Sequence, residues 1–246
     1  MKAQMVFQRY EQKYLITHRQ KELLLDAMRP YMSIDRYGRS TIRNVYFDTD
    51  TFRLIRRSIE APVYKEKLRI RSYQRTSPGD EVFVELKKKY KKIVFKRRML
   101  LPEQPAIDWL GGRGDILLPD TQIAREIHYF RDFYGLFRPT VFLAYEREAY
   151  YCHDGGDFRV TFDENIRART ARLTTAADDA GQALLTDDAV LMEIKTVGGI
   201  PLWMISVLSE QRIFRTPFSK YGTAYREIVF QKGGLIHAEL AVSGNF

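Results

Sequence analysis

The stretch Lys67-Leu68-Arg69-Ile70-Arg71 alternates cations with aliphatic residues. In a β-strand, residues two apart point to the same face, so a strand here carries its cations on one face and its apolar side chains on the other. Three more strand-like stretches place an acid and a base two residues apart: Glu11-Gln12-Lys13, Glu85-Leu86-Lys87 and Glu193-Ile194-Lys195. The repeated pattern predicts either a solvated sheet face with cross-strand ion pairs or a polar interior lined with charges.

Eight segments have the period-two alternation and the Val, Ile, Phe and Tyr content of strands. They are residues 5–15, 41–47, 63–73, 81–89, 92–100, 140–151, 158–163 and 190–197. Helices are predicted to begin near Thr17, Asp120, Pro201 and Ser219, since apolar residues at helical spacing follow each of them. We therefore expect one α+β domain over residues 1–246, with enough strands to close a barrel around side chains and one ligand.

The charge of the chain favours an anionic partner. The 246 residues carry a net charge of +9, which suits nucleic acid, a phosphorylated small molecule, polyphosphate or an anionic membrane, although it also aids solubility alone. Cys152 is the only cysteine, so an internal disulfide is excluded. Neither a signal peptide nor an apolar run of about 18 residues is visible, so we expect a cytoplasmic protein without a membrane span.

The cationic strands have the side chains that bind phosphate. Arg makes bidentate contacts with phosphate oxygens, and Lys acts on them as a point charge. Carboxylates among these cations would hold a hard divalent ion, because Mg²⁺ or Mn²⁺ is bound by one or two carboxylates together with substrate phosphates. Ser219 and Lys220 at a helix N-terminus indicate a further anion site, unless Ser219 is an ordinary N-cap.

Seven motifs occur in one order along the chain. They are Arg9-Tyr10-Glu11-Gln12-Lys13-Tyr14, Tyr46-Phe47-Asp48-Thr49, Lys67-Leu68-Arg69-Ile70-Arg71, Val84-Glu85-Leu86-Lys87, Phe95-Lys96-Arg97-Arg98, Glu193-Ile194-Lys195 and Ser219-Lys220-Tyr221. From about Phe7 to Phe230 the chain thereby resembles the VTC domain, the catalytic domain of the vacuolar transporter chaperone complex. This family lies within the triphosphate tunnel metalloenzyme (CYTH-like) superfamily. The resemblance implies an antiparallel eight-stranded β-barrel that forms a polar tunnel flanked by helices.

The resemblance also implies an activity, a metal and site residues. The activity is polyphosphate synthesis from ATP with Mn²⁺ or Mg²⁺, and Glu193 is the implied metal ligand, with Glu11 as a weaker candidate. The residues implied to bind phosphate are Lys13, Arg69, Arg71, Lys87, Lys96, Arg147, Arg159, Ser219 and Lys220, with Arg98 as the alternative to Lys96 if the register differs. Those implied to carry catalysis are Lys13, Arg69, Arg71, Lys87 and Glu193.

The chain departs from the family's relatives in two respects. Arg9 stands where the wider superfamily has the first Glu of Glu-x-Glu-x-Lys, which argues against its adenylate cyclase and thiamine triphosphatase branches. The regulatory SPX domain and the membrane helices of the eukaryotic proteins are not found in this sequence, so a separate membrane partner stays open.

Two other functions remain open from the sequence. The same tunnel would serve a metal-dependent tripolyphosphatase or nucleoside triphosphatase, with water as the acceptor. A non-catalytic protein would instead bind polyphosphate, or bind nucleic acid through the basic run Lys87-Lys88-Lys89-Tyr90-Lys91-Lys92. Charge runs of this kind usually form solvated hairpin tips, so nucleic acid is not the expected partner.

Overall fold

The computed structural model describes residues 10–91 and 93–230 of the chain. The strands are β1 (Tyr10–Thr17), β2 (Met32–Ile34), β3 (Ser40–Asp48), β4 (Tyr64–Ser72), β5 (Glu81–Tyr90), β6 (Ile93–Pro102), β7 (Arg138–Cys152), β8 (Arg159–Arg169), β9 (Gln182–Ala183) and β10 (Ala189–Thr196). The helices are α1 (His18–Met28), α2 (Arg53–Ile59), α3 (Glu103–Leu110), α4 (Gln122–Tyr134), α5 (Leu202–Glu210), α6 (Lys220–Ala224) and the π-helix η1 (Tyr225–Phe230). Each predicted strand corresponds to an observed one, although residues 5–9 and Lys92 lie outside the described residues.

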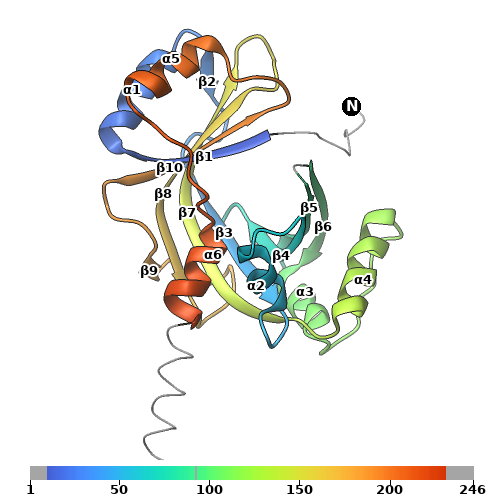
Figure 1. Cartoon of the computed structure of the whole chain (residues 1–246). Helices are drawn as coiled ribbons and strands as arrows, with labels where there is room; N and C mark the ends of the chain where they lie inside the picture. The colour runs from blue at the N-terminus through green and yellow to red at the C-terminus, as the bar shows by residue number, and fades with distance from the viewer. Residues whose placement is uncertain (1–9, 92, 231–246) are drawn as a thin grey trace, which may run out of the picture.

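All strands join one antiparallel sheet in the order β1-β10-β8-β7-β3-β4-β5-β6, with β2 paired to β7 and β9 paired to β8 (Figure 1). The α+β class and the antiparallel sheet are therefore confirmed. Within the described residues, β1 and β6 end the sheet without pairing to each other, so closure into a barrel stays a prediction.

The apolar face of the sheet is covered by helices in two places. Leu68 and Ile70 of β4 are fully buried with residues of β5, β6, α3 and α4, while Met192 and Ile194 of β10 are buried with residues of β1, β8, α1 and α5 (Figure 1). Full burial of one such side chain contributes about 1.5–3 kcal/mol. Because the strands alternate, burial of these residues turns the charged residues between them to the other face.

A third apolar cluster lies on that other face of the sheet. Ile42 and Tyr46 of β3 pack there against Tyr221 and Ala224 of α6, together with residues of α2 and η1. Tyr46 is paired in register with Arg69, and directly opposed cross-strand residues share a face. Helix α6 is therefore held on the same side of the sheet as the cations.

The local signals explain most of the helix ends. Thr17 and Gln20 form the predicted capping box of α1, and Ser219 caps α6 as expected. The cap predicted for α4 was wrong by one residue: Thr121 accepts a hydrogen bond from the backbone N–H of Ala124, whereas Asp120 forms an ion pair with Arg125. The helix begins after Thr121 because its hydroxyl accepts from the backbone N–H of the third helical residue, which would otherwise be unpaired.

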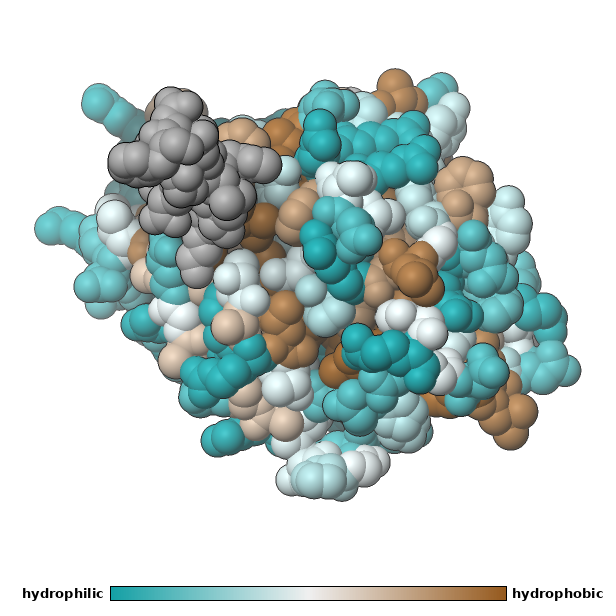
Figure 2. Space-filling view, turned by 90° about the horizontal axis from the view of Figure 1, so that it is seen from below, coloured by the Kyte–Doolittle hydropathy of each residue, from teal (hydrophilic) through white to brown (hydrophobic). Residues whose placement is uncertain are grey.

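None of the helices in the described part of the chain combines the length and the apolar character that crossing a bilayer requires. On the face seen from below, hydrophobic residues stand singly or in small groups between hydrophilic ones (Figure 2).

Candidate phosphate-binding site

The register of the sheet brings charged side chains from several strands to one face, which we call the charged face. Lys67 is opposite Lys87, which is opposite Lys96, and Arg69, Glu85 and Arg98 form the next row. On the other half of the sheet, Lys13 pairs with Glu193 and Glu11 with Lys195. The charged face thus contains the cations Lys13, Lys65, Lys67, Arg69, Arg71, Lys87, Lys89, Lys96, Arg98, Arg147, Arg159 and Lys195 and the acids Glu11, Glu85, Asp163 and Glu193.

Curvature of the sheet brings its two ends toward each other across the charged face (Figure 1). Lys87 Nζ of β5 lies 3.0 Å from Glu11 Oε2 of β1, although several strands separate β5 from β1 in the sheet order. The pair lowers the pKa of Glu11 to about 2, against the opposing effect of burial. The charged residues of the two halves therefore face one another across the curved sheet, although Lys87 remains partly exposed.

Glu85 organises the cations of β4, β5 and β6. Its Oε2 accepts hydrogen bonds from Arg69 Nε at 2.9 Å and Nη2 at 2.7 Å, and its Oε1 lies 2.7 Å from Lys96 Nζ. Arg71 and Arg98 approach the same carboxylate at 3.8 Å and 3.7 Å. Burial raises the pKa of Glu85, but Arg69, Arg71 and Lys96 outweigh that effect and lower it well below its usual range. One carboxylate therefore holds four cations in place.

Asp163 plays the same part for β7 and α6. It is fully buried, and its two oxygens accept hydrogen bonds from Arg147 Nε at 2.6 Å and Nη2 at 2.7 Å. Lys220 Nζ also donates to Asp163 Oδ2. Burial raises the pKa of Asp163, and the two cations lower it below its usual range, so the carboxylate is ionised and fixes both of them.

Glu193 lies at the centre of the second half of the charged face. Its carboxylate is 3.1 Å from Lys195, 3.4 Å from Lys13, 3.8 Å from Lys220 and 3.9 Å from Arg147. Burial alone raises the pKa of Glu193, whereas these four cations lower it well below its usual range. These contacts are longer than the bidentate pair at Asp163, so Glu193 is the carboxylate less committed to a single cation.

Lys67 is a cation of the charged face that the residues predicted from the sequence omit. Its Nζ donates to Ser219 Oγ at 3.0 Å, and no ion pair among residues 10–91 and 93–230 includes it. Burial, followed by repulsion from Lys13 and Lys87, lowers the pKa of Lys67 well below its usual range. The alternation that identified Arg69 and Arg71 also places Lys67 on the same face, so the sequence contained the signal.

Two tyrosines of the charged face were also missed, since they give no motif of their own. Tyr46 Oη accepts from Arg69 Nη1 at 3.1 Å, and Tyr145 Oη accepts from Arg71 Nη2 at 3.1 Å. Burial raises the pKa of Tyr145, but Arg147 and Arg71 lead a set of cations whose net effect lowers it. The phenols therefore hold the arginines without neutralising them.

Ser219 and Lys220 reach the charged face from the start of α6. Ser219 Oγ accepts from the backbone N–H of Gly222 at 3.2 Å as well as from Lys67, so it is both a helix cap and part of the cationic cluster. The position of α6 is fixed by Tyr221, which donates to the buried Asp48 at 3.1 Å and stacks on Tyr46 with ring centroids 4.3 Å apart.

Arg159 lies on the charged face by its register opposite Lys195, yet it differs from the other predicted residues. Its guanidinium lies over the ring of Tyr151 at 4.4 Å, and its buried Nε has no hydrogen-bond partner among the described residues. Within the same residues, the buried Oγ1 of Thr161, which is opposite Glu193, also lacks a partner. Unsatisfied buried polar atoms are costly, and a bound ligand on this part of the face would satisfy them.

Glu193 and Glu11 were the predicted metal ligands. In the part of the chain that the structure describes, no group of three or more His, Cys, Asp or Glu side chains is arranged to hold a metal ion alone. The donors nevertheless fit a hard divalent ion that shares its coordination with phosphate, because both carboxylates are ionised and close enough for each to affect the other. Both carboxylates are paired with lysines, Glu11 with Lys87 at 3.0 Å and Glu193 with Lys195 at 3.1 Å, so metal binding at either one would displace a lysine.

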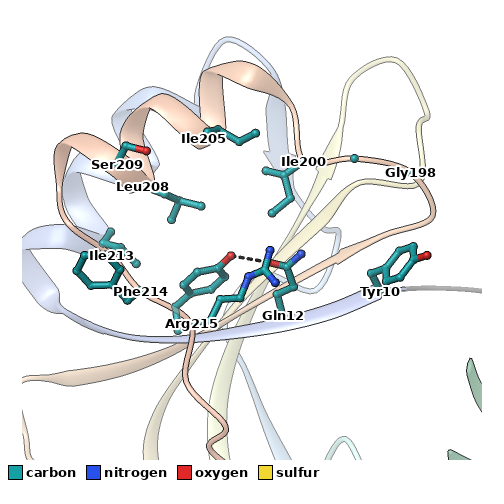
Figure 3. A pocket seen from close by; sticks show the side chains of 12 residues that line it. Tyr10, Gln12, Gly198, Ile200, Ile205, Leu208, Ser209, Ile213, Phe214 and Arg215 are labelled. Atoms are coloured by element: carbon teal, nitrogen blue, oxygen red, sulfur yellow. Dashed lines mark hydrogen bonds between the residues drawn. The ribbon is translucent and has the colours of Figure 1, made fainter. Parts of the chain in front are cut away.

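A separate cavity of about 630 Å³ lies between β1 and α5 (Figure 3). Tyr10, Gln12 and Tyr14 of β1 line it together with Gly198, Gly199, Ile200, Ile205, Leu208, Ser209, Ile213, Phe214 and Arg215. Successive β1 residues alternate between faces, so this cavity is on the side opposite Glu11 and Lys13. It is therefore not part of the charged face.

Comparison with known proteins finds a matching family and solved structures with some similarity. A family model described as the VTC domain matches residues 8–229. A proposed adenylate cyclase from Bacillus halodurans has 16% sequence identity and a TM-score of 0.54, over 88% of this chain and 96% of the other. A proposed adenylyl cyclase from Hippeastrum, with a dominant triphosphatase activity, has 18% identity and a TM-score of 0.49, over 89% and 94%. No significant match was found among curated proteins.

Proposed function

This chain belongs to the VTC domain family, within the triphosphate tunnel metalloenzyme superfamily, and from that premise we propose that it is a polyphosphate polymerase. It would transfer the γ-phosphate of ATP to the end of a growing polyphosphate chain. The observation that carries the proposal is the excess of cations over carboxylates on one concave face, where Lys67 in particular has no acidic partner in the described structure. Burial and mutual repulsion of these cations disfavour the unliganded face, and a bound anion of high charge would offset that repulsion.

In this proposal the cations bind and orient the phosphates of both substrates. Arginines fixed by Glu85 and Asp163 present their remaining N–H groups without having to reorganise, which is the condition for electrostatic stabilisation of a transition state. The residues assigned to phosphate are Lys13, Lys67, Arg69, Arg71, Lys87, Lys96, Arg98, Arg147, Arg159, Ser219 and Lys220.

A divalent cation, Mn²⁺ or Mg²⁺, would be held by Glu193, with Glu11 as a second ligand. When bound, it supplies charge neutralisation between neighbouring phosphate oxygens. Lys13, Lys195 and Lys220 lie within 4 Å of Glu193 and keep its carboxylate ionised, so this donor is available throughout the neutral pH range.

The chemical step requires little from the protein beyond position and charge. A terminal oxygen of the acceptor chain forms a bond to the γ-phosphorus as the bond from that phosphorus to the β,γ-bridging oxygen breaks, and ADP leaves. No side chain has to remove a proton, because the acceptor oxygen is already an anion. Closure of the strands into a tunnel belongs to this proposal, since a tunnel would hold donor and acceptor in line.

The proposal is tested by incubating the protein with ATP and Mn²⁺ and separating the products on a polyphosphate gel. A ladder of polymer with release of ADP supports it, while ADP and free phosphate without polymer would refute polymerisation. Wild-type protein with chelator, and a Lys87→Met variant with metal, are the controls for contaminating kinases.

A metal-dependent triphosphatase is the second candidate, and Tyr145 is the observation that favours it. Hydrolysis needs a group that accepts a proton from water, and the Tyr145 hydroxyl lies among Arg71, Arg147 and Lys220, which lower its pKa. Tyr145→Phe should slow phosphate release from tripolyphosphate more than it slows polymer formation, which would lose only the hydrogen bond that holds Arg71. If it slows both reactions equally, Tyr145 is not a base.

A further inference from the structure

At one end of β4, β5 and β6, apolar and aromatic side chains replace most of the charged ones on the charged face. Arg71 is opposite Phe83, and Phe83 is opposite Leu100, so these residues form the row next to that of Arg69, Glu85 and Arg98. Leu100 is 43% exposed, and Tyr73, which directly follows β4, is 46% exposed. Two large exposed side chains, Tyr73 and Leu100, and the phenyl ring of Phe83 therefore lie together beside the cations of this face.

The rings are arranged as a small platform with cations at its side. Tyr73 and Phe83 contact edge to face, with ring centroids 5.8 Å apart. The guanidinium of Arg71 lies 6.0 Å from the centre of the Tyr73 ring, and that of Arg98 lies 4.8 Å from the centre of the Phe83 ring. We call Tyr73, Phe83 and Leu100 the aromatic platform.

The same two arginines connect the platform to the phosphate-binding cations. Arg71 and Arg98 approach Glu85 at 3.8 Å and 3.7 Å, and Glu85 holds Arg69 and Lys96. Along β5, Phe83 and Lys87 are four positions apart, which corresponds to about 13 Å of strand. A molecule with an apolar, planar end and a polyanionic end can therefore lie along the strands and contact both regions at once.

We propose that the aromatic platform binds the base of a nucleoside triphosphate, with its triphosphate running from Arg71 toward Lys87. The proposal rests on the function proposed above and adds the place of the nucleoside. Any of the nucleobases can stack on aromatic rings and on guanidinium planes, because each base has a π face. Inorganic phosphate chains have no apolar part, so exposed Tyr73 and Leu100 contribute nothing to binding them.

The polarity that follows places the γ-phosphate among Lys67, Lys87 and Lys13, on the side of the platform that faces β1 and Glu193. Beyond that point, Lys65 and Lys89 are paired with each other in the next row of β4 and β5. The acceptor chain would then lie along these lysines, and the nucleoside diphosphate would leave past the platform.

The test compares two ligands on the full chain by titration calorimetry, ATP and inorganic tripolyphosphate. Tyr73→Ala should weaken ATP binding by on the order of tenfold, the size expected for loss of one stacking contact, and leave tripolyphosphate binding unchanged. Tyr73→Phe should restore ATP binding. Tyr129→Ala is the matched control, because Tyr129 is exposed and pairs with Phe133 on α4, away from the charged face.

The binding measurements distinguish a platform that binds the base from one that does not. In a variant that urea unfolding shows to be folded, equal losses for both ligands, or no loss for ATP, would overturn the platform. If Tyr73→Ala does not fold, Leu100→Ser provides the same comparison on a second exposed side chain. If the wild-type protein binds tripolyphosphate and ATP equally well, the platform is again excluded while the phosphate site stands; if it binds neither, the proposed function itself fails.

Discussion

Lys87 Nζ and Glu11 Oε2 lie 3.0 Å apart, which joins β5 to the opposite edge strand of the same sheet. The pair is partly exposed, with 38% and 17% of the two side chains accessible, so it contributes little to stability. In the proposed function the pair matters for binding, because Glu11 occupies a lysine that is assigned to phosphate.

Glu11→Gln should therefore strengthen metal-free binding of tripolyphosphate, since Lys87 is released and a negative charge is removed. The expected gain is about three- to tenfold, which corresponds to the weak coupling of partly exposed ion pairs. Calorimetry at low and at high salt measures it, and the gain should shrink at high salt. An unchanged affinity in Glu11→Gln would show that Lys87 is not available to phosphate.

Glu193→Gln should separate metal-dependent turnover from phosphate binding. The variant keeps the shape of the side chain but loses the ionised donor, so turnover with Mn²⁺ should fall by on the order of 10²–10³. Tripolyphosphate binding without metal should not weaken, because four cations around Glu193 lose a competing anion.

The matched control for that variant is Glu146→Gln. Glu146 is paired with Arg39 outside the charged face, and its side chain is 36% exposed. Turnover should be retained in this variant. A similar loss of turnover in both variants would mean that the Glu193→Gln variant is inactive because it is less stable. Urea unfolding would show that loss of stability.

Lys67→Met should stabilise the unliganded protein and weaken its ligand binding. The variant removes a buried cation whose neighbours are Lys13 and Lys87, so the free energy of unfolding should rise by roughly 1 kcal/mol. Tripolyphosphate binding should fall by about 10- to 100-fold, the value of one hydrogen bond to a charged group. Urea unfolding and calorimetry on the same preparation measure both, and a loss of stability in Lys67→Met would contradict the absence of an acidic partner.

Titration of Lys96 should make the protein more stable as the pH rises and should make its binding of tripolyphosphate weaker. Burial lowers its pKa to about 7 from an ordinary value of 10.5, more than Glu85 can restore, because Glu85 is shared with Arg69. Between pH 7 and 10.5 the unfolded chain then holds a proton that the folded chain lacks, so the free energy of unfolding rises with pH in this window. Tripolyphosphate binding should weaken over the same range as Lys96 loses its charge.

The proton itself can be followed. At pH 8, binding of tripolyphosphate should take up protons at Lys96, which calorimetry detects as a heat that depends on the ionisation enthalpy of the buffer. Lys96→Met should reduce this uptake and flatten the rise of stability with pH. Identical proton uptake in wild type and variant would assign the effect to the ligand's own titration.

The features that could be predicted from the sequence depend on residues that are close to one another along the chain. Alternation along β4 and β5 is visible in the sequence, so these two strands and the residues that share each of their faces were predicted. The caps of α1 and α6 were predicted for the same reason, since a capping residue and its partner are three positions apart.

Contacts between distant segments were not predictable in this way. Nothing in the sequence near Glu11 indicates that it meets Lys87, and nothing near Asp48 indicates Tyr221. Lys67 was missed although its face was known, because only the three-dimensional arrangement shows which cations lack an acid. The short strands β2 and β9 and the helices α2 and α3 depend on packing against the sheet and gave no distinct periodic signal.

Asp48 provides a final prediction about what holds Ser219 and Lys220 in place. It is the fully buried last residue of β3. It accepts hydrogen bonds from the backbone N–H groups of Thr49, Leu54 and Ile55 at 2.9 Å each, and from Tyr221 Oη at 3.1 Å. Asp48→Asn leaves one oxygen where two accepted hydrogen bonds, so it should cost about 1–3 kcal/mol in urea unfolding.

Tyr221→Phe removes only the hydroxyl that joins α6 to Asp48 and Thr140, so it distinguishes positioning from stability. It should cost about 1 kcal/mol in unfolding and weaken tripolyphosphate binding severalfold, because Ser219 and Lys220 would lose their fixed place beside Lys67 and Asp163. Ser219→Ala in the Tyr221→Phe background should then add less to the loss of binding than Ser219→Ala does alone. Strictly additive losses in this double-mutant cycle would show that Tyr221 does not position the start of α6.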